Sequence, residues 1–146
     1  MRGLAALFAG GGIAIAGYLS WAHYADASVV CPVGGGGCEA VQSSEYSEVA
    51  GVSVAVLGLA AYAAILALLA WDTPLARLLA AALALVGALF SGYLLFVQFF
   101  VIDAICAWCL VNDVVVAPGL AALTAWRLRS WEPDEEPPAQ LGRGSR

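Results

Sequence analysis

The chain has 146 residues, of which 62% are hydrophobic and only 12% are charged. A soluble globular domain averages about 45–50% apolar and about 25% charged residues, so this composition excludes one. With six arginines, no lysine and a net charge of −5, the chain also offers no basic stripe for nucleic-acid phosphates. The composition therefore predicts a small polytopic membrane protein.

Four segments are apolar and long enough to cross a bilayer, which takes about 20 residues as a helix. They are residues 4–22, 52–71, 75–101 and 104–128. We therefore expect an all-α membrane domain over residues 1–128, built as a bundle of four transmembrane helices. Residues 23–51 form its outer loop, and residues 129–146 form an acidic cytoplasmic tail that is expected to be disordered.

The arginines predict how the chain is oriented in the membrane. If the chain crosses four times, Arg2, Arg77, Arg127 and Arg129 all lie on one side, whereas the other side carries acidic residues and no arginine. The positive-inside rule then places both termini in the cytoplasm. All four cysteines fall on the outer face of the membrane, where disulfides form and persist.

The first span has an alternative interpretation as a cleaved signal peptide, because Ala25-Asp26-Ala27 resembles a signal-peptidase site. Its apolar stretch is longer than the roughly 7–15 residues of a signal core. Cleavage would also leave three helices and an odd topology. We therefore expect the first span to be retained.

Cys106 and Cys109 form a C-x-x-C motif at the outer mouth of the fourth span, where Asp103 can cap the helix. Residues i and i+3 of a helix project from one face, so the two sulfurs can close a disulfide. Cys106 is nearer the positive helix N-terminus, which favours a thiolate. Cys109 lies one turn deeper, where a lipid-soluble reactant can reach it.

Cys31 and Cys38 lie in the outer loop and are separated by Pro, Val and four consecutive glycines. Such a flexible tether allows the two cysteines to pair in one state and to reach another sulfur in the next. A zinc site, two structural disulfides and a thiol–disulfide relay are all compatible with two cysteine pairs. The spacing is wider than that of usual zinc ligands, so we favour the relay.

Two further residues near the C-x-x-C motif are functional candidates. Asp113 is an ionisable residue inside a span, one turn below Cys109, and a proton-handling role is one interpretation. A polar contact near the mouth of the span is the alternative. Trp108 stands between the two cysteines, where it can shield the disulfide, touch a bound reactant or simply sit at the membrane interface.

This ordered set resembles the vitamin K epoxide reductase family, in its bacterial, disulfide-forming branch without a fused thioredoxin domain. The resemblance covers residues 4–128 and rests on matching positions in the loop, the second span and the fourth span. These are Cys31, Cys38, Val41, Ser43, Ser44, Gly51, Gly58, Tyr62, Cys106 and Cys109.

The resemblance implies a four-helix bundle around a quinone, either ubiquinone or menaquinone, which Cys109 reduces. Cys106 would exchange with a loop cysteine, for which we favour Cys38, and the loop pair would take electrons from a separate thioredoxin-fold, DsbA-like periplasmic protein. Residues 43–49 would form a short lid helix. The quinone-binding residues would be Cys109, Ser44, Trp108, Val54, Gly58 and Asp113.

Vertebrate members of the family carry Asn and Tyr where this chain has Val54 and Asp113, which argues against epoxide reduction. The expected protein is a quinone-linked thiol oxidoreductase of the bacterial cytoplasmic membrane that supports disulfide formation. A vitamin K quinone or epoxide reductase is one alternative. A non-enzymatic membrane scaffold with two static disulfides is the other.

Overall fold

The computed structural model describes residues 1–130, apart from residues 33 and 35. Nearly all of the expected tail at 129–146 lies outside the described residues. The elements, in chain order, are α1 (Arg2–Tyr24), α2 (Gly37–Gln42), the 3₁₀ turn η1 (Glu45–Ser47), β1 (Glu48–Val49), β2 (Val52–Ser53), α3 (Val54–Trp71), α4 (Pro74–Val97), the π-helix η2 (Gln98–Ile102), α5 (Ala107–Val111), the π-helix η3 (Asn112–Val116) and α6 (Ala117–Arg129).

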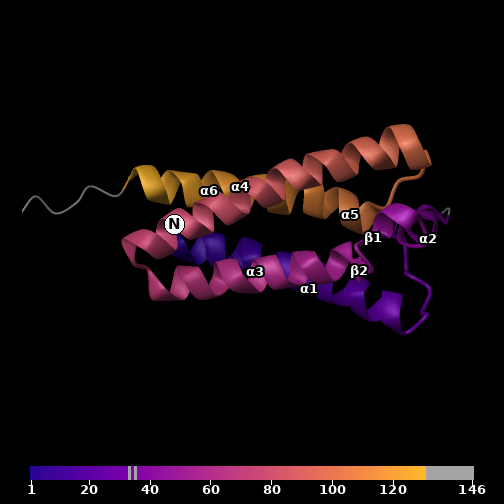
Figure 1. Ribbon diagram of the computed structural model, residues 1–146, viewed down its shortest axis with the longest axis horizontal. Helices are drawn as coiled ribbons and strands as arrows, with labels where there is room; N and C mark the ends of the chain where they lie inside the picture. The colour runs from indigo at the N-terminus through magenta and orange to yellow at the C-terminus, as the bar shows by residue number, and fades with distance from the viewer. Residues whose placement is uncertain (33, 35, 131–146) are drawn as a thin grey trace, which may run out of the picture.

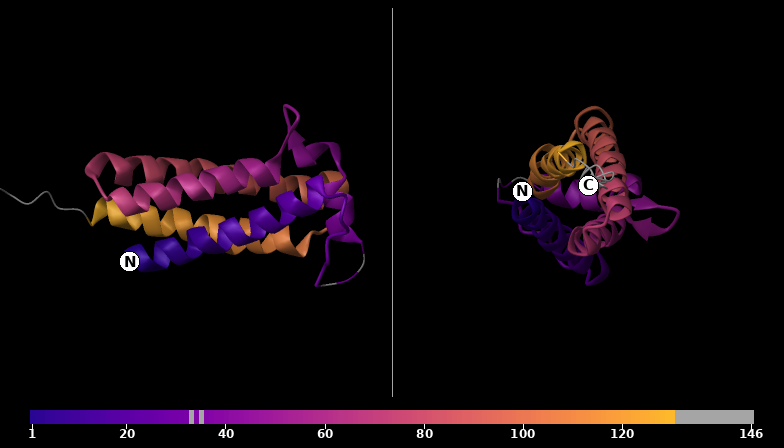
Figure 2. Two further views of the ribbon diagram at one scale, coloured as in Figure 1. Left: turned by 90° about the horizontal axis from the view of Figure 1, so that it is seen from below. Right: turned by 90° about the vertical axis from the view of Figure 1, so that its left-hand side faces the viewer.

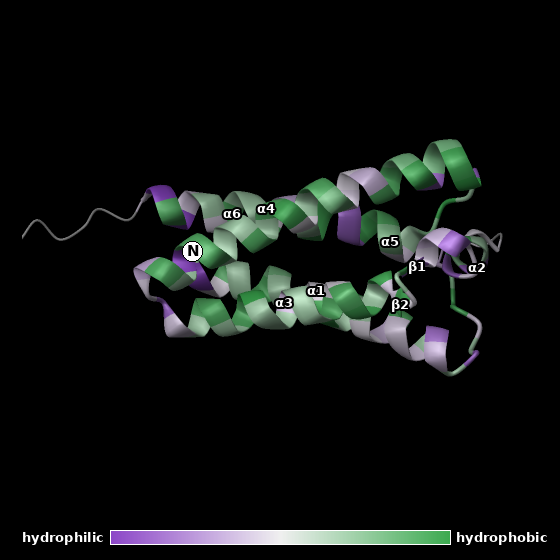
Figure 3. Cartoon of the chain, viewed as in Figure 1, coloured by the Kyte–Doolittle hydropathy of each residue, from purple (hydrophilic) through white to green (hydrophobic). Residues whose placement is uncertain are grey.

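Four helical segments of the described chain are long and apolar enough to cross a membrane: Arg2–Tyr24, Val54–Trp71, Pro74–Ile102 and Ala107–Arg129. They run side by side as one bundle, in which α1 packs against α3 and α4 packs against α6 (Figures 1 and 2). The expected all-α membrane bundle is therefore confirmed. The helices consist largely of hydrophobic residues (Figure 3), and many of these are exposed, among them Leu7, Leu89 and Phe100, as suits contact with lipid.

Small residues allow the helices to approach closely in the interior of the bundle. Ala5 and Ala9 of α1 are fully buried, and Gly12 faces the ring of Tyr62 from α3. A Cβ at Gly12 would lie only 2.6 Å from that ring, so a larger residue does not fit there. The α1–α3 contact therefore depends on the absence of a side chain at Gly12.

Charged residues cluster at the end of the bundle where the first span begins and the last span ends. Asp72, in the turn between α3 and α4, accepts hydrogen bonds from Arg77 (2.8 Å), Arg127 (2.7 Å) and Arg2 (3.5 Å). The adjacent Thr73 caps α4 by accepting from the Ala76 N–H. One carboxylate thus joins the start of α1, the start of α4 and the end of α6.

The fourth span begins later than the expected residue 104. Asp103 adopts a left-handed conformation (φ 51°) and ends η2, so the prediction that it caps the fourth helix is wrong. Cys106 takes the N-cap position instead, in extended conformation. Further along, η3 precedes Pro118, whose missing N–H interrupts the regular helical hydrogen bonds.

The outer loop covers the opposite end of the bundle with α2, η1 and a two-stranded hairpin in which Val49 pairs with Val52. The short helix that was expected at residues 43–49 is present only as the 3₁₀ turn η1, and the longer helix of the loop, α2, precedes it at Gly37–Gln42. The hydroxyls of Ser43 and Ser44 donate to the carbonyls of Glu39 and Val41 and so end α2.

Candidate redox site

Cys31 and Cys38 are joined by a disulfide, with their Cα atoms 5.8 Å apart. Cys31 is half-exposed, whereas Cys38, in the first turn of α2, is only 1% exposed. The two sulfurs of the loop pair therefore differ in access: a reagent from water can approach Cys31, and Cys38 faces the protein.

Helix α2 is held against the segment that leads into the C-x-x-C motif. Gly37 lies so close to Ile105 that a Cβ at position 37 would collide with the Ile105 carbonyl oxygen. Because only glycine permits this approach, the start of α2, with Cys38, packs next to the residue before the buried Cys106. The loop pair and the C-x-x-C pair consequently lie at the same end of the bundle (Figure 1).

Cys106 and Cys109 are free thiols with their sulfurs 2.7 Å apart. The Cys109 thiol and the Cys109 backbone N–H both donate to the Cys106 sulfur. The Gln98 side-chain oxygen accepts from the Cys106 backbone N–H at 3.1 Å and fixes the start of the helix. The two hydrogen bonds from Cys109, chiefly that from its thiol, lower the pKa of Cys106, which precedes the membrane-spanning helix, to about 7.

Gln42, which the sequence reasoning missed, contacts the second cysteine of the motif. Its side-chain Nε2 lies 3.7 Å from the Cys109 sulfur and donates to it. Gln42 stands four residues after Cys38 on α2, so the two side chains share one face of that helix. That i, i+4 spacing from a cysteine is the signal by which the sequence could have identified Gln42.

An apolar cavity of about 370 Å³ lies inside the bundle beside Cys109. Its volume falls within the range of small-molecule sites, about 300–1,000 Å³. Residues from α1, α3, α4, η3 and the outer loop line it. Five of the six residues expected to bind a quinone are among them: Ser44, Val54, Gly58, Cys109 and Asp113.

Trp108, the sixth expected residue, lies elsewhere. Its indole N–H donates to the Val30 carbonyl at 2.8 Å, and its ring packs edge-on to Tyr18. The Tyr18 hydroxyl in turn accepts from the Val30 N–H. Trp108 therefore ties the chain just before Cys31 to the C-x-x-C helix, and its contact with a quinone stays a prediction.

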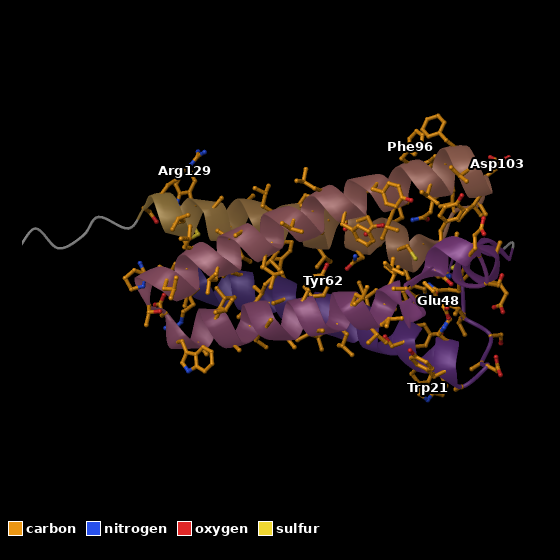
Figure 4. The ribbon with its side chains drawn as sticks, viewed as in Figure 1. Trp21, Glu48, Tyr62, Phe96, Asp103 and Arg129 are labelled. Carbon is orange, nitrogen blue, oxygen red and sulfur yellow. A yellow bond between two sulfur atoms is a disulfide. The ribbon has the colours of Figure 1, made fainter. Side chains whose placement is uncertain are left out.

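Polar side chains in the wall of the cavity are joined by a short series of hydrogen bonds. The Tyr62 hydroxyl, midway along the bundle (Figure 4), donates to Asn112 Oδ1 at 2.8 Å, and Asn112 Nδ2 donates to Asp113 Oδ1 at 3.0 Å. Asp113 is 3% exposed, and its Oδ2 finds no hydrogen-bond partner among the described residues. A buried polar atom normally has a partner, so this oxygen suits the polar group of a bound ligand.

The site therefore fits a quinone: an apolar cavity for the ring, one unpaired acceptor oxygen for a ring hydroxyl of the reduced form, and a thiol at the edge of the cavity. The loop disulfide already uses two of the four sulfurs that a cysteine zinc site would need. The arrangement is suited to moving a disulfide from one cysteine pair to the other beside a ligand cavity.

A family model described as "Vitamin K epoxide reductase family" matches residues 4–124. The matched range contains all of α3 and α4, all but the first two residues of α1 and the last five of α6, and all four cysteines. A search of curated proteins found no match.

Proposed function

This chain belongs to the vitamin K epoxide reductase family and is a multi-pass membrane thiol oxidoreductase, and on that premise we propose that it couples disulfide formation to quinone reduction. In this proposal the Cys31–Cys38 pair collects electrons and the Cys106–Cys109 pair delivers them to ubiquinone or menaquinone. One observation carries the proposal: α2, which holds Cys38 of the loop disulfide, packs against the helix of the two free thiols, and Cys109 of that helix borders the apolar cavity.

The electron donor is a separate thioredoxin-fold, DsbA-like protein. Its thiolate attacks Cys31, which is supported by the half-exposed position of Cys31 and the burial of Cys38. The reduced loop pair then passes its electrons to the Cys106–Cys109 disulfide through Cys38, which is supported by the packing of Gly37 against Ile105. The donor leaves oxidised and can introduce disulfides into other proteins.

The quinone is held in the cavity by Ser44, Val54, Gly58 and Asp113, with Cys109 at its edge. When bound, it accepts two electrons and two protons and so takes up what the dithiol releases. The apolar walls exclude water from the sulfur, and the unpaired Asp113 Oδ2 can accept a hydrogen bond from a ring hydroxyl of the reduced quinone. Val54 and Asp113 replace the Asn and Tyr of vertebrate members, and we therefore propose quinone rather than epoxide as the substrate.

We place the protein in the bacterial cytoplasmic membrane with the cysteines on the outer face. The cluster of Arg2, Arg77 and Arg127 around Asp72 at the other end of the bundle supports this orientation through the positive-inside rule. Figure 4 shows that Arg129 lies at that same end, opposite Asp103.

The test is a quinone-reduction assay with purified protein and a reduced DsbA-like donor, followed by the change in quinone absorbance. Cys109→Ala should abolish the reduction of quinone while circular dichroism stays that of the wild type. Leu110→Ala, next to Cys109 but outside the cavity lining, is the matched control and should retain most of the rate. An inactive wild-type protein would favour a static scaffold, and an active Cys109→Ala variant would contradict the role of Cys109.

A further inference from the structure

Helix α2 presents two functional groups to the C-x-x-C motif from one face. Cys38 is buried against the protein at the start of α2, and Gln42 donates to the Cys109 sulfur one turn later. Helix α2 packs against α5, which carries Cys109. Within the described residues, Gln42 is the one side chain from another element whose N–H reaches that sulfur.

Exchange between the two cysteine pairs requires a sulfur to leave with an electron pair. Under the proposed function, Cys38 attacks Cys106, so that the Cys106–Cys109 bond breaks and Cys109 leaves as a thiolate. Cys109 borders an apolar cavity, where a new negative charge is costly unless a donor meets it. The reaction therefore needs a hydrogen-bond donor at the place where Gln42 lies.

We propose that Gln42 is a catalytic residue whose side-chain N–H stabilises the Cys109 thiolate as it leaves Cys106. This inference rests on the proposed function, because it concerns the same transfer between the two pairs. The amide is a neutral donor that is already directed at the sulfur before charge develops, as effective stabilisation of a reacting atom requires.

The steps balance in bonds and protons. The Cys38 thiolate forms a bond to Cys106, and the electron pair of the Cys106–Cys109 bond goes to Cys109. Cys31 then attacks Cys38, which forms the Cys31–Cys38 disulfide and releases Cys106 as a thiolate. The proton that Cys31 loses is taken up by Cys109, so one disulfide is consumed and one is formed.

The structure corresponds to the state reached after the last of these exchange steps. Cys31 and Cys38 are bonded, Cys109 is a thiol that donates to Cys106, and Gln42 still contacts the Cys109 sulfur. The Cys106 sulfur accepts two hydrogen bonds, as suits the second leaving group. One helix thus carries the attacking sulfur and the donor for the group that departs, and a single docking of α2 brings both into place.

The test compares Gln42→Met, which keeps the length of the side chain and removes its N–H, with Glu39→Gln. Glu39 is exposed on the same helix, and its side chain forms no hydrogen bond or ion pair within the described residues. Fully oxidised protein, free of quinone, is mixed with dithiothreitol, quenched in acid and alkylated, and each cysteine is followed by mass spectrometry.

Gln42→Met should lower the rate at which the Cys109 thiol forms by about tenfold or more, while Cys31–Cys38 is reduced at the wild-type rate. In a Cys106→Ser background, alkylation of Cys109 at a fixed pH should also slow by about tenfold. Glu39→Gln should change neither rate.

Two results would overturn the inference. One is exchange at the wild-type rate in Gln42→Met, and the other is an equal loss in Glu39→Gln, which would indicate a general disturbance of α2. Both results differ from what failure of the proposed function would give. In that case the wild-type protein itself would move no electrons from the loop pair to the C-x-x-C pair or to quinone.

Discussion

Cys106 and Cys109 are three residues apart but have different surroundings. Cys106 is fully buried at the N-cap of α5, where its sulfur accepts hydrogen bonds from the Cys109 thiol and backbone N–H. Cys109 borders the apolar cavity and contacts Gln42. The C-x-x-C spacing places both sulfurs on one face of the helix, and the hydrogen bonds from Cys109, chiefly that from its thiol, favour the thiolate at Cys106.

The reactivity of Cys106 should depend on pH and on Cys109. With both loop cysteines replaced by serine, iodoacetamide should alkylate Cys106 with a midpoint near its pKa of about 7, because the hydrogen bonds from Cys109 stabilise the thiolate. Cys109→Ala removes the largest of these contributions, so the midpoint should rise toward that of an ordinary thiol, about 8.5. Peptide mass spectrometry across a pH series measures both midpoints. An unchanged midpoint in Cys109→Ala would show that the thiol hydrogen bond is not the cause.

At the scale of elements, the close approach of α1 to α3 depends on Gly12. Gly12→Ala would place a methyl group within 2.6 Å of the Tyr62 ring, and that ring lines the cavity and bonds to Asn112. Overpacking of this kind typically costs about 1–3 kcal/mol. We therefore expect a lower midpoint of thermal unfolding in detergent and weaker quinone binding.

Gly11→Ala is the matched control for that substitution, because a Cβ at position 11 meets nothing within 4 Å. It should be neutral or slightly stabilising, since alanine favours a helix more than glycine does. Equal unfolding midpoints in the two variants would contradict the packing argument.

The charged cluster at the other end should make stability depend on pH. The hydrogen bond from Arg77, together with the charges of Arg127 and Arg2, lowers the pKa of Asp72. The charged carboxylate then stabilises the folded protein at pH values above the ordinary pKa of aspartate, which is about 4. That stabilisation is lost as the pH falls through the lowered pKa that Asp72 has in the folded protein.

Asp72→Asn should therefore lower the thermal midpoint at neutral pH, and the difference from wild type should shrink as the solution is acidified. Asp103→Asn serves as the control, since Asp103 forms no ion pair within the described residues. Thermal unfolding in detergent across a pH series measures the effect. A difference between Asp72→Asn and wild type that is constant with pH would argue against a charge interaction.

For the whole molecule, the features that sequence could predict are those set by local pattern. Hydropathy predicts four helices because each span must satisfy its own backbone hydrogen bonds in lipid. Helical spacing places Cys106 next to Cys109, and the resemblance to a family identified Ser44, Val54 and Gly58, which line the cavity in the structure.

The features that sequence could not predict depend on contacts between distant segments. The position of α2 follows from serine hydroxyls that end it and from the glycine contact with Ile105. Gln42 meets Cys109 across 67 positions of the chain. The late start of the fourth span follows from the backbone conformation of Asp103, which its residue type permits but does not require.

The placement of both cysteine pairs at one end of the bundle has an energetic consequence. Under the proposed route, the donor approaches from the same end at which Cys109 meets the cavity, and the protons of the dithiol travel with its electrons. No net charge then moves from one leaflet to the other in a catalytic cycle. Such turnover is electroneutral, and the voltage across the bilayer neither drives it nor opposes it.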